Sequence, residues 1–337
     1  MLSPPVAFRT LAVVHETAYR YEAPVELAHH LAYLRPRHDA WQTLDGHLLH
    51  VDPEPSRPQA GPDALGNWRN VFALYVPHEA LLVRASSRVT VANRHAGLDA
   101  QACAPWEEAA LRLRYLAGAP YAAEAEFSFP SPFVPLHDEL RDYALPSFPP
   151  GRPVAEAALE LMHRIHEDFT YAPASTQINT PVLDAYTQRV GVCQDFAHVM
   201  IGCLRSLGLA ARYVSGYLLT EPPPGQPRLV GADASHAWVS VWSPAADESD
   251  GASDDNTWFD LDPTNDRAAG EDYVTLAIGR DFSDVSPLRG VIHGGDHHVL
   301  QVGVTVEPVP AATAAMAAAP DAPDTPLTPP QAPESPG

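Results

Sequence analysis

The spacing of hydrophobic residues changes part-way along the chain. From about residue 9 to residue 95, apolar and polar residues alternate in short runs such as "RTLAVVHETAYRYEAPV" and "LLVRASSRVTVAN", and turn-forming residues separate the runs. Alternation with a period of two is typical of strands that bury one face. The pattern predicts an antiparallel β-sandwich or barrel whose first strand ends at Pro24. Since no cluster of reactive side chains accompanies it, we expect this region to have a structural or docking role.

Helical spacing follows the β-rich region. The run "VAEAALELMHRIHEDF", which comes directly after Pro153, predicts a helix. A second helix is expected to begin at Cys193 and to end at Gly208, where a left-handed cap is typical. Strands are then expected at 211–219, 235–242 and 257–261, with a last one at 299–308. Most of the chemistry discussed below lies in this second half.

A chain of 337 residues is too long for one ordinary core, which favours two domains. We expect an N-terminal β-sandwich-like domain at residues 1–125 and a second, helix-containing domain with the C-terminal strand at 126–308. Residues 309–337 are rich in proline and alanine and contain almost no large apolar side chain. Such a segment cannot offset the entropy lost on ordering, so we expect a disordered tail.

Composition narrows the classes of partner. The formal net charge is −21, which argues against nucleic acid and against an anionic membrane surface, because both attract basic proteins. No run is long and apolar enough to span a bilayer, and the N-terminus lacks the pattern of a secretion signal. The three cysteines are too few and too scattered for a disulfide framework. We therefore expect a cytoplasmic protein with free thiols and no cofactor.

Cys193 is a candidate nucleophile. It lies in the first turn of its predicted helix, where backbone N–H groups lack intrahelical partners and the helix dipole is positive. Both features favour thiolate over thiol, and the same N–H groups can receive an oxyanion. The alternative is a small apolar residue at a helix start. Cys103 and Cys203 suit that alternative better, because each looks like a core or incidental cysteine.

A cysteine nucleophile needs a base and an orienting carboxylate. His236 begins the predicted strand in "DASHAWVSVW", and Asp262 ends the strand in "WFDLDPTND". A lone strand histidine, one of 16 in the chain, is more often structural. Asp260 points to the same face of its strand and competes with Asp262. Taken together, the order and placement of these residues make a Cys193–His236–Asp262 triad the leading interpretation.

Other polar groups are secondary candidates. The segment "HGGDHH" brings together His293, Asp296, His297 and His298, which could bind a metal, but its glycines favour a turn. We therefore expect no metal site. Candidates for substrate binding are Tyr171, Gln177 and Asp195, and Asp195 would also suit the first turn of a helix as a capping or loop-holding residue.

Four motifs resemble those of bacterial transglutaminase-like proteins, a branch of the papain-like cysteine enzymes. They are "GVCQDFAH", "ARYVSGYL", "SHAWVSVW" and "WFDLDPTN", which occur in the family's order within about residues 150–270. The β-rich half and "RDFSDVSPLRGVIHGGDHHVLQVGVTV" are similar to the regions that flank this core in bacteria. The resemblance implies an α+β fold, in which a papain-like core with a cysteine-bearing helix on an antiparallel sheet follows a β-sandwich. It also implies Cys193 as nucleophile, His236 as general base and acid, and Asp262 as orienting carboxylate.

The implied reaction is acyl transfer from a protein or peptide amide through a thioester on Cys193. Attack by an amine, from a protein or a small molecule, gives cross-linking or amine transfer. Attack by water makes the protein a cysteine peptidase or amidase with the same triad. A third alternative, a catalytically silent binding module, is disfavoured because such a copy is free to lose any of the three residues. All 21 basic residues are arginine, so the chain offers no lysine acceptor of its own.

Overall fold

The computed structural model describes residues 7–96, 99–118, 121–173, 175–220, 235–246 and 257–310. Most of the acidic segment between His236 and Asp262 lies outside these residues, as does nearly all of the predicted disordered tail. In the described part of the chain, no helix is both long and apolar enough to cross a membrane.

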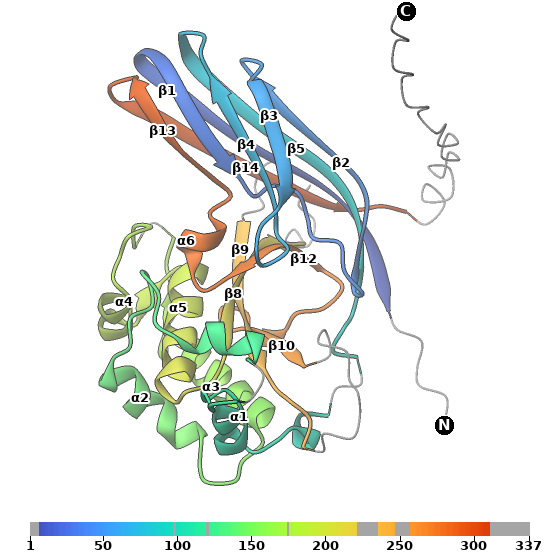
Figure 1. Ribbon diagram of the computed structural model, residues 1–337, viewed down its shortest axis with the longest axis vertical. Helices are drawn as coiled ribbons and strands as arrows, with labels where there is room; N and C mark the ends of the chain where they lie inside the picture. The colour runs from blue at the N-terminus through green and yellow to red at the C-terminus, as the bar shows by residue number, and fades with distance from the viewer. Residues whose placement is uncertain are drawn as a thin grey trace, which may run out of the picture.

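The N-terminal region is one seven-stranded sheet built around a single long strand, β1 (Phe8–Ala32). Its first half pairs with β5 and β14, and its second half pairs with β4 and β13 (Figure 1). Apolar side chains of β1, β2, β4 and β5, among them Val25, Phe72 and Val83, pack in one cluster. The strands are β2 (Gln42–Asp52), β3 (Ser56–Pro62), β4 (Trp68–Leu74), β5 (His78–Ala92), β13 (Leu288–Gly294) and β14 (His298–Pro308).

Strand β1 continues through Pro24, where the sequence pattern predicts its end. Pairing with β5 runs without a break to Arg20 and shifts register before Val25. Pro24 therefore lies at an irregularity, where its missing N–H removes no ladder hydrogen bond. Its carbonyl still accepts a hydrogen bond of 3.2 Å from the N–H of Gly295.

The last two strands join the N-terminal sheet. The expected domain division places residues up to 308 with the helical domain, but β13 pairs with Val25–Ala32 and β14 pairs with residues 11–21 of β1. The structure corrects the division at this point. Alternation predicts that a segment is a strand, but it does not predict which sheet edge the strand joins. Strand β1 is long enough to pair with β5 and β14 along its first half and with β4 and β13 along its second half.

The second sheet carries the candidate site. It is antiparallel, with the order β11-β10-β9-β8-β12, and helix α5 (Cys193–Ser206) contacts β8 and β9 and shares their apolar core (Figure 1). Gly208 follows α5 at φ 81°, which confirms the predicted cap. Since β9 and β10 are antiparallel neighbours, the start of β9 lies beside the end of β10. The strands are β8 (Ala211–Leu218), β9 (Ser235–Trp242), β10 (Trp258–Asp262), β11 (Arg267–Ala268) and β12 (Tyr273–Gly279).

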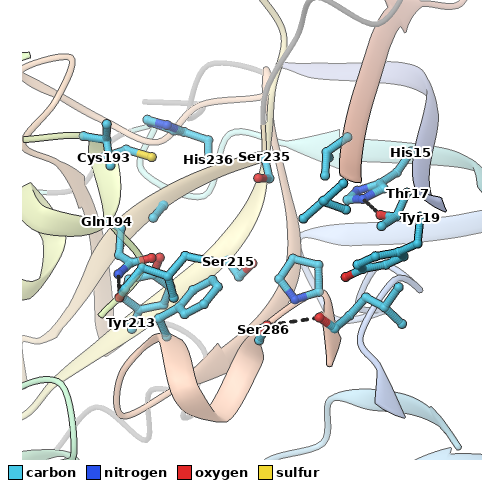
Figure 2. A pocket seen from close by; sticks show the side chains of 18 of the residues that line it. His15, Thr17, Tyr19, Cys193, Gln194, Tyr213, Ser215, Ser235, His236 and Ser286 are labelled. Carbon is cyan, nitrogen blue, oxygen red and sulfur yellow. Dashed lines mark hydrogen bonds between the residues drawn. The ribbon is translucent and has the colours of Figure 1, made fainter. Parts of the chain in front are cut away.

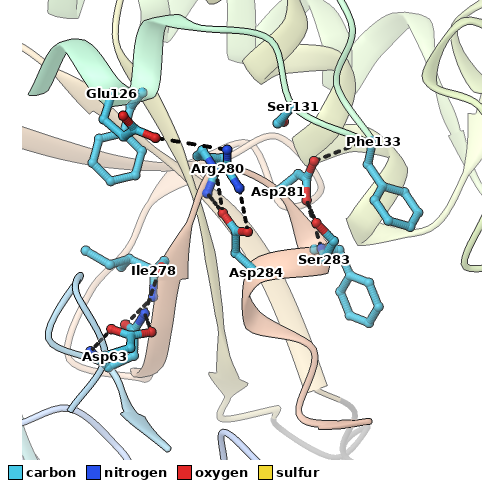
Figure 3. Close-up of polar contacts among 12 residues, drawn as sticks. Asp63, Glu126, Ser131, Phe133, Ile278, Arg280, Asp281, Ser283 and Asp284 are labelled. Carbon is cyan, nitrogen blue, oxygen red and sulfur yellow. Dashed lines mark hydrogen bonds and ion pairs between the residues drawn. The ribbon is translucent and has the colours of Figure 1, made fainter. Parts of the chain in front are cut away.

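The remaining helices and short strands lie outside the two large sheets. They are η1 (Ala100–Ala102), α1 (Trp106–Arg112), η2 (Ala123–Ser128), α2 (Asp138–Ala144), η3 (Leu145–Ser147), α3 (Val154–Asp168), β6 (Thr170–Tyr171), α4 (Val182–Gln188), β7 (Val190–Gly191) and α6 (Phe282–Val285). The run after Pro153 thus forms the predicted helix as α3. Asp281, at the start of α6, accepts hydrogen bonds from the N–H groups of Phe133 and Ser283 at 2.7 and 2.8 Å (Figure 3).

Two buried side-chain amides join the N-terminal domain to the edge strand β12. Gln42 donates to the carbonyl of Thr275 at 2.8 Å and accepts from its N–H at 2.7 Å. Asn67 makes the same pair of bonds with Ile278, both at 2.8 Å, and Asp63 holds the Asn67 amide at 3.0 Å (Figure 3). Each amide therefore satisfies backbone groups of β12 as a neighbouring strand would.

Replacement of Gln42 by alanine should destabilise the fold. Gln42→Ala leaves the buried N–H of Thr275 without its partner, which costs about 1–3 kcal/mol, whereas the carbonyl of Thr275 still accepts from the N–H of Arg37 at 3.0 Å. The free energy of unfolding in urea should fall by at least that amount. Gln59→Ala, at an exposed position of β3, is the control and should change it little. Equal losses in the two variants would contradict the proposed role of the amide.

Candidate active site

The backbone leading into Cys193 is held by Asp195. Its carboxylate accepts hydrogen bonds from the N–H of Val192 at 2.8 Å and from the hydroxyl of Thr176 at 2.6 Å. A Cβ on Gly191 would lie 2.6 Å from the Cβ of Asp195, so only glycine permits this approach. Burial raises the pKa of Asp195 against the opposing effect of these hydrogen bonds. Asp195 therefore fixes the turn that presents Cys193 at the first position of α5.

His236 and Asp262 are in direct contact. The Nε2 atom of His236 lies 2.6 Å from Oδ2 of Asp262, and the Asp262 side chain has no exposed surface. The contact follows from the topology, because His236 is the second residue of β9 and Asp262 is the last residue of its antiparallel neighbour β10.

Asp262 is held by four further donor groups. Its Oδ2 atom accepts from the Tyr273 hydroxyl at 2.8 Å and from the Asn265 amide at 2.6 Å. Its Oδ1 atom accepts from the N–H groups of Thr264 and Asn265 at 2.9 and 3.2 Å. Burial by itself would raise the pKa of Asp262, but the hydrogen bonds from His236, Asn265 and Tyr273 outweigh it and lower this pKa. The carboxylate is therefore ionised at neutral pH.

The same imidazole reaches Cys193. Burial disfavours its charged form, but hydrogen bonds to Asp262 and to Cys193, together with their charges, outweigh burial and raise the pKa of His236 to about 10. Figure 2 shows the Cys193 sulfur directed toward the His236 ring. Since Nε2 faces Asp262, Nδ1 is the ring nitrogen that remains for the thiol. The structure thus brings together the three residues that the sequence selected as a triad.

Asp260 lies in a different environment from Asp262. It forms an ion pair with Arg94 of the N-terminal domain at 3.3 Å, and its own N–H contacts the ring of His95. Burial would raise the pKa of Asp260, but the nearby Arg94, His95 and Arg212 lower it. Asp260 pairs with Ser240 across the ladder, two residues before Asp262, and serves contacts between the domains.

A cavity of about 350 Å³ lies in front of Cys193 and His236. Figure 2 shows Tyr213 and Ser215 on one side and His15, Thr17 and Tyr19 of β1 on the other. The candidates for substrate binding differ in position. Tyr171 lines the cavity, whereas Gln177 and Asp195 are not among its lining residues.

The "HGGDHH" segment and the other two cysteines lie apart from the Cys193 cavity. Gly294, Gly295 and Asp296 have φ values of 89°, 90° and 48°, so "HGGDHH" forms the turn between β13 and β14. Across the described residues, no three or more His, Cys, Asp and Glu side chains are grouped to hold a metal. Cys103 and Cys203 are buried, and burial raises the pKa of both thiols, that of Cys203 to about 12.

The chain matches two family patterns. Residues 11–90 match the bacterial transglutaminase-like N-terminal region, and residues 147–263 match the transglutaminase-like superfamily. An uncharacterized protein of Mycobacterium tuberculosis is 41% identical over 299 residues, which cover 88% of this chain and 92% of the relative. The chain belongs to the transglutaminase-like superfamily. This membership confirms the family resemblance of the four motifs.

Two more distant comparisons concern the fold and the core. A solved structure from Cytophaga hutchinsonii, described as a "Putative Cysteine Protease", superposes with a TM-score of 0.67 at 18% identity, covering 90% of this chain and 92% of that one. This likeness confirms the α+β papain-like fold class. A protein-glutamine gamma-glutamyltransferase of Pseudomonas aeruginosa is 33% identical over 132 residues, which are 38% of this chain and 17% of that protein. The superfamily suggests cysteine-based acyl transfer or proteolysis.

Sequence reasoning missed Asn265 and Tyr273. Asn265 follows Asp262 by three residues, so the turn-forming "DPTN" could have indicated a side chain that folds back onto the carboxylate. Tyr273 lies on β12, two strands away from β9 in the sheet. No spacing along the chain indicates that its hydroxyl reaches Asp262.

The imidazole of His236 should titrate near pH 10. Replacing Asp262 by asparagine removes a negative charge and a hydrogen-bond acceptor that favour the imidazolium, so Asp262→Asn should lower this pKa. Nuclear magnetic resonance of ring-labelled histidine gives the titration midpoint directly. Asp260→Asn is the matched control and should leave the His236 midpoint within about half a unit. A midpoint that did not move in Asp262→Asn would rule out the carboxylate as the cause.

Proposed function

We propose that this protein is a cysteine-dependent acyltransferase that acts on protein or peptide amides. The observation that carries the proposal is the hydrogen-bonded series from Cys193 through His236 to Asp262 at the end of a cavity. The similarity to a named protein-glutamine gamma-glutamyltransferase over the core favours a glutamine side chain as acyl donor.

The first half-reaction forms a thioester. The Cys193 thiolate attacks the amide carbonyl carbon, and the oxyanion forms beside the N–H groups of the first turn of α5. The imidazolium of His236 donates its proton to the amide nitrogen, the carbon–nitrogen bond breaks, and ammonia or an amine leaves. Asp262 holds the ring orientation and stabilises its positive charge.

The second half-reaction regenerates the Cys193 thiolate and the imidazolium of His236. A primary amine attacks the thioester, His236 accepts its proton, and the carbon–sulfur bond breaks to release a new amide. Water in place of the amine gives hydrolysis, so a peptidase or amidase is the alternative function on the same residues. The fold similarity to a protein described as a "Putative Cysteine Protease" is the observation that favours this alternative.

Asp262→Asn should lower turnover by about a hundredfold or more, because the imidazole loses its charge partner and orientation. Asp260→Asn should change turnover by less than about fivefold and should act mainly on the free energy of unfolding, since Asp260 pairs with Arg94. Steady-state rates and urea unfolding of both variants separate the two effects. The reverse order of turnover losses would contradict the assignment of Asp262.

A donor and acceptor screen tests the function. Glutamine peptides are offered with and without a fluorescent primary amine, and ammonia release and amine incorporation are both measured. The parent should do both, and Cys193→Ala should lose about a thousandfold or more in rate while keeping its fold. Cys203→Ala is the control, since Cys203 is buried in the core.

The absence of lysine makes the self-reaction informative. Incubated alone, the native chain should form no covalent ladder beyond linkage at its N-terminal amine, because it contains no lysine. Ladders that appear only after a lysine-containing protein is added support the transferase. Ammonia or peptide fragments without amine incorporation would favour the hydrolase, and no turnover of any amide would contradict both.

A further inference from the structure

The side of the cavity opposite Cys193 is formed by the N-terminal sheet. Thr17 and Tyr19 of β1 and Leu300 and Val302 of β14 line it, and we refer to these four residues as the β1–β14 wall. In the ladder Thr17 pairs with Val302 and Tyr19 pairs with Leu300. The wall is therefore two cross-strand pairs on one face of the sheet, and Figure 2 shows Thr17 and Tyr19 on the side of the cavity opposite Cys193.

This wall is fixed to the second sheet. His15, the next residue of β1 on the same face, has its Nε2 atom 3.0 Å from the Thr17 hydroxyl and its Nδ1 atom 3.0 Å from the Tyr217 hydroxyl. Tyr217 lies on β8, two residues after Ser215 of the cavity. The wall and the nucleophile therefore belong to one packed unit, so the distance between them is set before a substrate binds.

The cavity has no Asp, Glu or Arg among its described lining residues. Burial lowers the pKa of His15 to about 4, so this ring is neutral at pH 7. Burial also raises the pKa of Tyr19 and Tyr213, which stay protonated. In a chain of net charge −21, the described residues that line the cavity, apart from Cys193 and His236, are thus uncharged.

The outer part of the wall is apolar and open to solvent. Leu300 and Val302 are 46% and 53% exposed, and across the cavity Ile178 is 61% exposed. Large exposed apolar side chains that line one cavity are typical of a ligand-binding or protein-binding surface. A charged group at this position would lose hydration without gaining a partner, whereas an apolar group would cover apolar surface.

We propose that the β1–β14 wall is a subsite for an uncharged apolar or aromatic side chain of the acyl donor, close to the reacting amide. This inference rests on the proposed function. It gives the N-terminal domain a part in substrate selection, because that domain supplies every residue of the wall. The thiol and the wall share one cavity of about 350 Å³, which holds a reacting group and one side chain.

Alkylation of Cys193 by chloroacetamides tests the wall without amide turnover. The probes are chloroacetamide, its N-benzyl derivative and its cationic N-(2-aminoethyl) derivative. Mass spectrometry shows that the modification is at Cys193. Each alkylation rate is divided by the rate of the same probe with N-acetylcysteine, which removes differences in the intrinsic reactivity of the probes. In the parent, the normalised N-benzyl rate should exceed that of chloroacetamide by about tenfold, the gain expected from covering one aromatic group.

Two single substitutions on β14 form a matched pair. Leu300→Asp should remove most of the N-benzyl advantage and raise the normalised rate of the cationic probe, which a general folding defect would not do. Val299→Asp introduces the same charge one residue away, at a side chain that is 61% exposed and does not line the cavity, and it should keep the parent's order of probes.

The outcomes separate this inference from the proposed function. Equal normalised rates for all probes, with amide turnover intact, would overturn the wall and leave the function standing. An N-benzyl advantage that disappears as protein concentration rises would assign the wall to contacts between copies and would also overturn it. A Cys193 that reacts with chloroacetamide no faster than Cys203 would overturn the proposed function and the inference together.

Discussion

The buried carboxylate of Asp262 is the group on which the geometry of the site depends. It has no exposed surface and accepts hydrogen bonds from His236, Asn265 and Tyr273 and from the backbone of Thr264 and Asn265. An ionised carboxylate in an interior is strongly destabilising unless each oxygen has partners. Three strands and one turn must therefore be in register for Asp262 to be tolerated. That register also fixes the ring of His236, and it thereby fixes where the ring lies relative to the thiol of Cys193.

Buried side-chain hydrogen bonds join the N-terminal domain to the second sheet. The amides of Gln42 and Asn67 occupy the hydrogen-bonding positions that a sixth strand would fill beside β12, and His15 bridges β1 to β8. Such bonds are directional, so they set one relative position of the two domains more tightly than apolar packing alone. The cavity in front of Cys193 needs this precision, because its two sides come from different domains.

Some residues of the candidate site were predicted from the sequence more directly than others. Cys193 was selected by its position at a helix start, which is a local property, and His236 and Asp262 by their positions at strand ends. Alternation alone could not separate Asp262 from Asp260, since both point to the same face of β10. The position of Asp262 at the strand end favoured it, and the structure adds that Asp260 instead pairs with Arg94 of the N-terminal domain.

The sequence by itself determined the local elements and the family: the helix from Cys193 to its glycine cap, the strands that follow, and the four motifs. These follow from which face each element buries, which hydrophobic spacing encodes directly. Only the tertiary structure decided that β13 and β14 join β1, that Tyr273 donates to Asp262, and that Leu300 and Val302 face the nucleophile. Each of these depends on which element packs beside which. Spacing along a chain does not encode that choice, because any strand with a buried face can pair with several edges.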